Sequence, residues 1–323
     1  MKAIICEKYG QPEVLRMVDV DPPVPNDDEV LVRVHAASVN PQDWHLMTGL
    51  PYFMRAMNGL RTPKVREVGT DYAGVVESVG AAVTRFQPGD AVFGVRNGAF
   101  AEWIRAGESG AIVPMPAGVS FEDAACLPVA GLTALQGLRA GGLTGGQNVL
   151  VIGASGGVGS YAVQIAVAAG ARVTGVCSTG NLDLVRSLGA DQVVDYTQQD
   201  FARQPDRYDL ILDNVGTRSI ADRRRVLADG GTLVSVSGPK TNRLLGPAAA
   251  TMRLVAVAKV TGARLRWVLA KVDRDDLGTL AAMLASGQIR SVVDRSMALA
   301  DVPQAIGLVG TGHTRGKLVI KMS

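Results

Sequence analysis

Residues 149–166, VLVIGASGGVGSYAVQIA, limit the fold of this chain more than any other stretch. The apolar start predicts a buried strand, the glycines predict a tight turn, and the apolar spacing that follows predicts a helix. Aligned on its last glycine, the turn follows G-x-G-x-x-G with alanine in first place: Ala154, Ser155, Gly156, Gly157, Val158 and Gly159. Gly156 would let the backbone approach a pyrophosphate, and Gly159 would let the helix pack closely on the strand. This context predicts a dinucleotide site, and a turn without a ligand is the alternative.

The rest of the chain predicts two domains, because 323 residues exceed one ordinary domain. From residue 148 to residue 238, strand and helix patterns alternate, which predicts an α/β domain with a doubly wound parallel sheet. In the first third, short strands bounded by Gly, Pro and Asp predict an irregular, barrel-like domain. We expect the last strand, GKLVIKM, to rejoin this first domain.

Charge and composition exclude several kinds of function. The net charge is only +3 and there is no basic block, so nucleic acid is not an expected partner. Cys6, Cys126 and Cys177 are few and far apart, which indicates a reducing compartment and a cytoplasmic protein. Residues 247–271 are apolar but carry five cations, so we expect no stable membrane insertion. Two amphipathic helices broken near Gly262 and covering a substrate cleft fit this segment better than membrane-surface binding.

The strand ends of the α/β domain indicate which dinucleotide binds. After the second strand, residues 176–181 read VCSTGN and contain no carboxylate to hold a ribose 2′-hydroxyl. The side chains of Ser178, Asn181 and Tyr196 can donate hydrogen bonds to a 2′-phosphate, which favours NADPH. Gly180 supplies no cation, so NADH remains open. Further candidates follow the fourth and fifth strands at the same edge: Asn214, Val215, Gly216, Ser237 and Gly238.

A series of short motifs runs in order along nearly the whole chain: EVLVRVHAASVNPQDW, GTDYAGVVESVG, FQPGDAVFG, LPVAGLTALQGL, GASGGVG, RSLGAD, DNVG and RGKLVI. In these motifs the chain resembles the medium-chain dehydrogenase/reductases, in particular the zinc-independent quinone oxidoreductases that include zeta-crystallin. The resemblance implies a chaperonin-10-like catalytic domain over residues 1–122, completed by residues 290–323. It also implies a Rossmann NAD(P)-binding domain over residues 123–289 and a homodimer. The apolar Val292 and Val293 are expected in a Rossmann sheet edge that pairs with a second copy.

The resemblance also suggests that zinc is absent. Zinc-dependent relatives bind the metal through Cys, His and a later Cys or Asp, and this chain has Asn40, Thr70 and Val129 at those positions. His35 and His45 alone are weak evidence for a metal site. Without a Lewis acid, hydride transfer to an acceptor that is already electrophilic is the easier chemistry. We therefore expect reduction of a quinone or an enone by NADPH.

Several site residues are implied by the family. Asn40 would face nicotinamide and substrate, Asp43 would cap the next helix or orient Asn40, and Tyr52 would donate a proton or form a wall of the cleft. Thr133 would contact the nicotinamide end, and Arg315 and Lys317 would lie near the cofactor. A separate basic run, residues 223–225, is predicted to lie on an exposed helix face.

Alternative functions remain open at this point. One is an NADPH-binding protein with a structural or redox-sensing function and little turnover. The others are an alcohol dehydrogenase and an enoyl thioester reductase. The sequence motifs suit a binding protein as well as an enzyme, because both must hold the cofactor.

Overall fold

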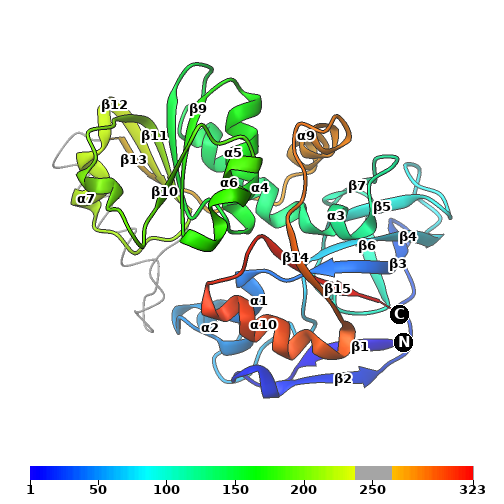
Figure 1. Cartoon of the computed structure of the whole chain (residues 1–323). Helices are drawn as coiled ribbons and strands as arrows, with labels where there is room; N and C mark the ends of the chain where they lie inside the picture. The colour runs from blue at the N-terminus through cyan, green and yellow to red at the C-terminus, as the bar shows by residue number, and fades with distance from the viewer. Residues whose placement is uncertain (237–263, 323) are drawn as a thin grey trace. The chain divides into compact units, whose positions relative to one another are not determined.

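A computed structural model describes residues 1–236 and 264–322 of the chain. It divides into two compact units, Met1–Leu132 with Val272–Ser323 and Thr133–Lys271 (Figure 1). The predicted Ser237 and Gly238, and most of the predicted helical segment, lie outside the described residues.

The first unit consists mainly of short strands. Its strands are β1 (Lys2–Cys6), β2 (Leu15–Asp19), β3 (Glu29–Ser38), β4 (Asp71–Val79), β5 (Ala91–Val95), β6 (Trp103–Gly107), β7 (Ile112–Pro114), β14 (Val293–Ala298) and β15 (Lys317–Lys321). Its helices are η1 (Pro12–Val14), α1 (Pro41–Thr48), α2 (Phe53–Asn58), α3 (Phe121–Cys126), α9 (Arg274–Ala285), η4 (Leu299–Asp301) and α10 (Val302–Thr311), and α4 (Pro128–Ala140) runs on into the second unit.

Strand β3 organises the sheet of this unit. The order is β14-β15-β3-β4-β5-β7, and β6 pairs with the first half of β3. Val30, Val32 and Val34 of β3 are buried in a core that α10 also lines through Val302 and Ile306. The prediction that the last strand rejoins the first domain is confirmed, because β15 pairs antiparallel with β3.

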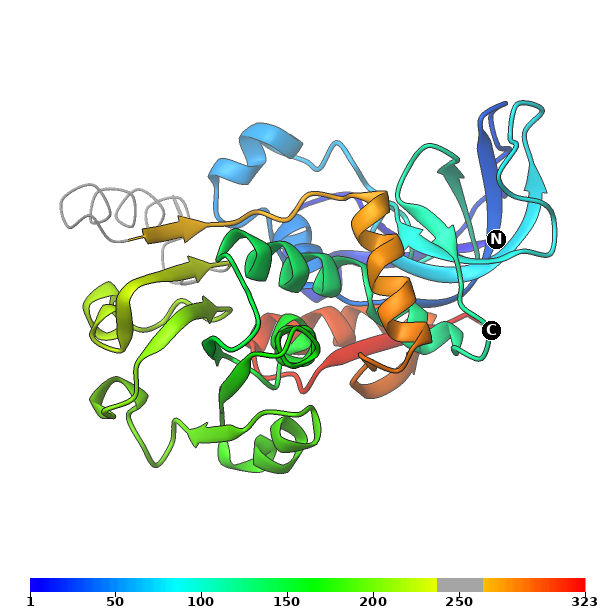
Figure 2. The same ribbon diagram turned by 90° about the horizontal axis from the view of Figure 1, so that it is seen from above.

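The second unit is a parallel α/β sheet. Its elements are β8 (Asn148–Ile152), α5 (Gly157–Ala168), β9 (Arg172–Cys177), η2 (Thr179–Asn181), α6 (Leu182–Ser187), β10 (Gln192–Asp195), η3 (Phe201–Arg203), β11 (Tyr208–Asp213), α7 (Ile220–Arg225), β12 (Leu227–Ser235) and β13 (Arg264–Trp267). The strand order β10-β9-β8-β11-β12-β13 is that of a dinucleotide-binding fold whose order reverses between β8 and β11. Figure 2 shows β13 alongside β12 at one edge of this sheet.

Three expectations differ from this architecture. Residues 264–267 form a strand and not a helix, because they pair in parallel with β12. Residues 123–132 and 272–289 belong to the first unit, because α3 packs on β3 and β4 and α9 packs on β7. Val292 is buried beside β14, and Val293 begins that strand, which pairs with β15 in the first unit's sheet. These valines therefore do not lie at an edge of the second unit's sheet.

Candidate functional site

The glycine turn joins β8 to α5 as predicted. Gly153 has a left-handed backbone with φ of 79°, and its N–H donates to the Val176 carbonyl of β9 at 3.1 Å. Helix α5 begins at Gly157, and its N-cap, Gly156, offers no side-chain acceptor to the first-turn N–H groups. These N–H groups also lack the intrahelical partners that later residues have, so the turn presents donors and a positive helix end.

Two glycines of the turn differ in the space around them. A Cβ on Gly159 would lie 2.0 Å from the Gly153 carbonyl oxygen, so α5 packs too closely on the turn for any side chain. A Cβ on Gly156 would meet only the same oxygen, at 3.5 Å. The turn has no room for a side chain at Gly159, where the helix packs, but has free space beside Gly156. This is the arrangement that a bound pyrophosphate requires.

The loop after β9 carries the predicted 2′-phosphate donors. Asn181 Nδ2 donates to Ser178 Oγ at 3.0 Å, and both side chains are partly exposed. Tyr196 is 48% exposed at the end of the neighbouring strand. A carboxylate that the sequence analysis missed lies beside them, because Asp195 accepts a hydrogen bond from Thr179 Oγ1 at 2.6 Å. The signal was available, since parallel neighbours such as β9 and β10 end at one edge of a sheet.

The loop after β11 is held in place by a buried ion pair. Asp213 Oδ1 accepts from the N–H groups of Val215 and Gly216, each at 2.9 Å, and Asn214 Nδ2 donates to the Ile152 carbonyl at 3.0 Å. The other oxygen of Asp213 bonds Arg223 of α7. The predicted exposure of the basic run is wrong for Arg223, which is 6% exposed.

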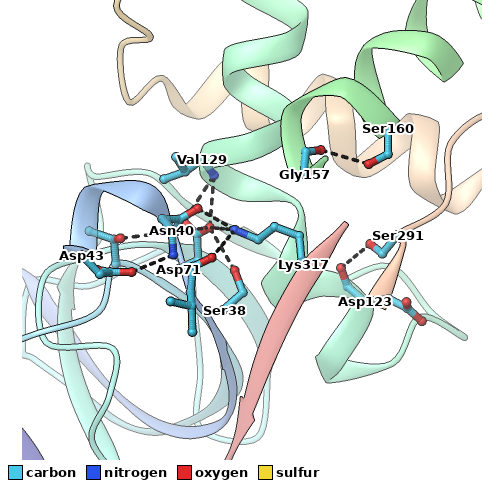
Figure 3. Close-up of polar contacts among 12 residues, drawn as sticks. Ser38, Asn40, Asp43, Asp71, Asp123, Val129, Gly157, Ser160, Ser291 and Lys317 are labelled. Carbon is cyan, nitrogen blue, oxygen red and sulfur yellow. Dashed lines mark hydrogen bonds and ion pairs between the residues drawn. The ribbon is translucent and has the colours of Figure 1, made fainter. Parts of the chain in front are cut away.

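A polar cluster in the first unit brings together Asn40, Asp71 and Lys317 (Figure 3). Asn40 Nδ2 donates to Asp71 Oδ2 at 2.9 Å, and Lys317 Nζ donates to Asn40 Oδ1 and lies 3.6 Å from Asp71 Oδ2. Ser38 Oγ and the Val129 N–H also donate to Asp71, both at 3.2 Å. Burial raises the pKa of Asp71, and the Lys317 ammonium and these hydrogen bonds oppose the rise. Asn40 is 1% exposed, and both ends of its amide bond other side chains.

Asp43 caps helix α1, as one of its two predicted roles requires. Its Oδ2 accepts the Asn40 N–H at 2.8 Å in a capping box. Burial raises the pKa of Asp43 to about 7, helped by the nearby charge of Asp71. Its Oδ1 is buried without a protein hydrogen-bond partner among the described residues.

The remaining predicted residues are placed as follows. Tyr52 is 44% exposed, and its ring lies 4.8 Å from the Arg55 guanidinium carbon, which also stacks on Tyr9 at 4.4 Å. Thr133 is partly buried in α4, and Arg315 is exposed two residues before β15. Contacts of these side chains with cofactor or substrate stay predictions.

Comparison with known proteins decides the family. A family model described as alcohol dehydrogenase GroES-like domain matches residues 26–190, and one described as zinc-binding dehydrogenase matches residues 188–320. The chain is 35% identical over 356 residues to the mitochondrial NAD(P)H oxidoreductase RTN4IP1 of Mus musculus, covering 100% of this chain and 89% of that protein. The chain belongs to the medium-chain dehydrogenase/reductase superfamily.

Other medium-chain relatives match along the whole chain. A 2-methylene-furan-3-one reductase of Solanum lycopersicum is 32% identical over 335 residues, covering 99% of this chain and 79% of that protein. The solved quinone oxidoreductase from Coxiella burnetii has a TM-score of 0.87 and 31% identity, covering 100% of this chain and 99% of that chain. The predicted fold class and superfamily are confirmed, and the chain is an oxidoreductase of an NAD(P)H-dependent family.

The medium-chain family includes zinc-binding members, so the residues at the zinc-ligand positions decide whether this chain could hold that metal there. The three predicted positions do meet in space, because Asn40 Nδ2 lies 3.5 Å from Thr70 Oγ1 and the Val129 N–H bonds the same Asp71 as Asn40. Zinc binds thiolate, imidazole and carboxylate groups. An amide, a hydroxyl and a valine, with an ammonium bonded to the amide oxygen, do not fit that set.

The two histidines do not complete a metal site. His35 stacks on Phe121 with 4.4 Å between ring centroids, and His45 Nδ1 lies 2.6 Å from the Leu50 carbonyl oxygen. Residues 1–236 and 264–322 contain no group of three or more His, Cys, Asp or Glu side chains that could hold a metal. In the same ranges, no helix has the length and hydropathy needed to cross a membrane.

Proposed function

We propose that this medium-chain oxidoreductase reduces a quinone or an α,β-unsaturated carbonyl compound with NADPH and without zinc. The observation that carries the proposal is the Lys317 ammonium bonded to Asn40 and beside Asp71. A positive side chain already neutralises the carboxylate at the place where zinc-dependent relatives would need ligands. A divalent cation there would meet like charge and no thiolate or imidazole.

The chemistry of the acceptor follows from this site. Alcohol oxidation needs a group that stabilises an alkoxide, and a zinc ion usually supplies it. A quinone or enone accepts hydride more easily because its own conjugated oxygen takes up the negative charge. The names of two relatives, a quinone oxidoreductase and a 2-methylene-furan-3-one reductase, support acceptors of this kind.

The cofactor would be held by the second unit. The open backbone at Gly156 and the N–H groups at the start of α5 would bind the pyrophosphate, and Ser178 and Asn181 would face the 2′-phosphate. Bound NADPH supplies the hydride. In the first unit, Asn40 is fixed by Asp71 and Lys317. Tyr52, which is 44% exposed and whose ring stacks on Arg55, would supply the proton to an enolate.

The decisive experiment measures NADPH oxidation against a panel of quinones, enones, enals, enoyl thioesters and simple ketones. We expect turnover with quinones or enones that persists after chelation, with no stoichiometric zinc in the purified protein. Activity lost on removal of one bound zinc per chain would contradict the proposal. NADPH binding without turnover on any acceptor would favour the binding-protein alternative.

A matched pair of variants tests the cofactor site. Gly156→Val should remain folded, because the added Cβ has room, but should lose NADPH affinity by at least about 100-fold, since its side chain occupies the pyrophosphate position. Gly159→Val should instead disrupt the packing of α5. Unchanged NADPH titration of folded Gly156→Val would show that the site is elsewhere.

The homodimer is also part of the proposal, and a monomer mass at every concentration would contradict it.

A further inference from the structure

Strands β9 and β10 place a carboxylate beside the loop that would face the ribose 2′ position. They are parallel neighbours, and their register pairs Asp195 with Cys177, the last residue of β9. The Tyr196 N–H then donates to the Cys177 carbonyl at 3.0 Å, which ties the two strand ends together. The loop of residues 178–181 and the end of β10 therefore form one surface at the carboxyl edge of the sheet.

The Asp195 carboxylate is fixed in place by three donors. Thr179 Oγ1 donates to its Oδ2 at 2.6 Å, and the Thr197 hydroxyl and N–H donate to its Oδ1 at 2.8 and 2.9 Å. These hydrogen bonds, first the one from Thr179, lower the pKa of Asp195, so the side chain is ionised at neutral pH. The residue is 8% exposed, so its position is set by the protein.

Among the described ion pairs, none neutralises this charge. Arg186, on the helix that follows the loop, pairs with Asp183 at 2.8 Å. Ser178 and Asn181 are uncharged, and Gly180 has no side chain. The Thr179 hydroxyl is committed to Asp195 and is withdrawn from any ligand. The loop thus combines neutral donors for a phosphate with a fixed negative charge next to them.

We propose that Asp195 is a specificity-determining residue of this site, whose fixed charge opposes a 2′-phosphate and reduces the preference for NADPH over NADH. The inference rests on the proposed cofactor site. Like charges at short range repel, and the dianionic phosphate carries the charge that a free 2′-hydroxyl lacks. Asp195 acts on the ligand through its charge, because Thr179 and Thr197 bond its oxygens. The chain therefore uses both cofactors, with a modest preference for NADPH.

The test replaces Asp195 with Asn, which removes the charge; its Oδ1 can still accept from the Thr197 N–H and hydroxyl, and its Nδ2 can donate to Thr179 Oγ1. Asp191→Asn is the matched control: it makes the same charge change just before β10, where Asp191 bonds the N–H of Val173 in β9. Calorimetry would measure the affinities for NADPH and NADH, and for 2′,5′-ADP and 5′-AMP as fragments with and without the 2′-phosphate. Asp195→Asn should raise both affinity ratios by about tenfold, mainly by tightening the phosphorylated ligand. Asp191→Asn should leave both ratios unchanged.

The unaltered chain gives an independent result. Salt screens repulsion between charges, though less where one of them is largely covered, as Asp195 is at 8% exposed. The affinity of the unaltered chain for 2′,5′-ADP relative to 5′-AMP should therefore rise slightly with ionic strength. A ratio that falls with salt would indicate a cationic 2′ site and overturn the inference. Asp195→Ser provides a second charge removal should Asp195→Asn unfold. If the unaltered chain binds both cofactors but Asp195→Asn and Asp195→Ser leave the affinity ratios of the phosphorylated to the unphosphorylated ligands unchanged, Asp195 has no such role. If it binds neither cofactor nor fragment, the proposed function itself fails.

Discussion

Each unit of this oxidoreductase contains a buried ion pair between an aspartate and a basic residue, and the two pairs have different structural roles. In the first unit, Asp71 and Lys317 form a cluster with Asn40 that connects three strands. Asn40 follows β3, Asp71 begins β4 and Lys317 begins β15. In the second unit, Asp213 and Arg223 support the loop after β11, at the carboxyl ends of the parallel strands, and Asp213 also accepts from two backbone N–H groups of that loop. The first pair lies in a buried cluster, and the second fixes the loop that follows β11.

The difference lies in what surrounds each carboxylate. Asp71 accepts from Ser38, Asn40 and the backbone of Val129, so the removal of one charge disturbs several segments. Each carboxylate keeps its neutral donors if its cation is lost. However, Lys317 also donates to the buried Asn40 and to the Val39 carbonyl, whereas Arg223 donates to the carbonyl of the exposed Ser219. A buried charge without compensation is costly, but hydrogen bonds recover part of that cost. We therefore expect the two pairs to respond differently to the same kind of substitution.

The largest effect is expected at Lys317. Lys317→Met removes the counter-ion of Asp71, which then keeps only its neutral donors, and also removes the donor to the Asn40 Oδ1 and Val39 carbonyl oxygens. It should lower the free energy of unfolding by about 3–5 kcal/mol. The control is Lys321→Met on the same strand, where the lysine pairs with Glu122 at 2.6 Å but is 55% exposed. It should cost less than about 1 kcal/mol. Chemical denaturation measures both, and equal losses would remove the distinction between buried and exposed pairs.

The second unit should show a smaller loss of stability together with a loss of binding. Arg223→Met should lower the free energy of unfolding by about 2–3 kcal/mol, since Asp213 keeps its two backbone donors and Arg223 otherwise donates to the carbonyl of the exposed Ser219. It should also weaken NADPH binding, because the loop of residues 214–216 loses part of its anchor. Arg225→Met is the control, because Arg225 is 57% exposed and pairs with Asp222 at 3.5 Å. If Arg223→Met unfolds more easily but binds NADPH as before, this loop does not contribute to the site.

Neither pair was found from the sequence, although all four residues were visible in it. The sequence predicted the alternating strands and helices of the second unit and the glycine turn between β8 and α5. Those features depend on neighbours along the chain. Ion pairs between Asp71 and Lys317 depend on tertiary contacts between distant segments, which no local pattern encodes. For Arg223 there was a partial signal, since Ile220 and Val226 lie three residues to either side and mark an inner helix face.

The candidate site was predictable to a similar extent. The position of the turn, the cap by Asp43 and the convergence of Asn40, Thr70 and Val129 followed from motifs. The engagement of the Asn40 amide by Lys317 did not, because it requires β15 to return beside β3. Asp195 was not predicted because it ends β10, the third strand of this unit, and reaches the loop after β9 only through the pairing of the two strands.

A pH measurement sharpens the description of the first unit's cluster. Asp43 has a folded-state pKa of about 7, above its ordinary value of 3.8, so the folded chain holds a proton that the unfolded chain releases. Stability from this group is present at low pH and is lost as the pH rises toward and through about 7. Relative to Asp43→Asn, the unaltered chain should lose about 2–3 kcal/mol between about pH 5 and pH 8. Parallel stability profiles of the two proteins would contradict a raised pKa at Asp43.

The smallest effect is expected at the exposed edge of the second unit. Position 180 has open space around it, since a Cβ there meets nothing within 4 Å, and its φ is outside the left-handed region. Gly180→Arg can therefore place a cation beside a 2′-phosphate and should raise the NADPH preference by up to about tenfold, near 1.4 kcal/mol. The gain should stay modest because the Asp195 carboxylate, next to Thr179, also attracts the guanidinium. Ser178→Asp should reverse the preference through like-charge repulsion. The measurement is kcat/KM with NADPH and with NADH for the unaltered chain and both variants. Equal or better use of NADH by the unaltered chain would refute the NADPH assignment while leaving hydride transfer intact.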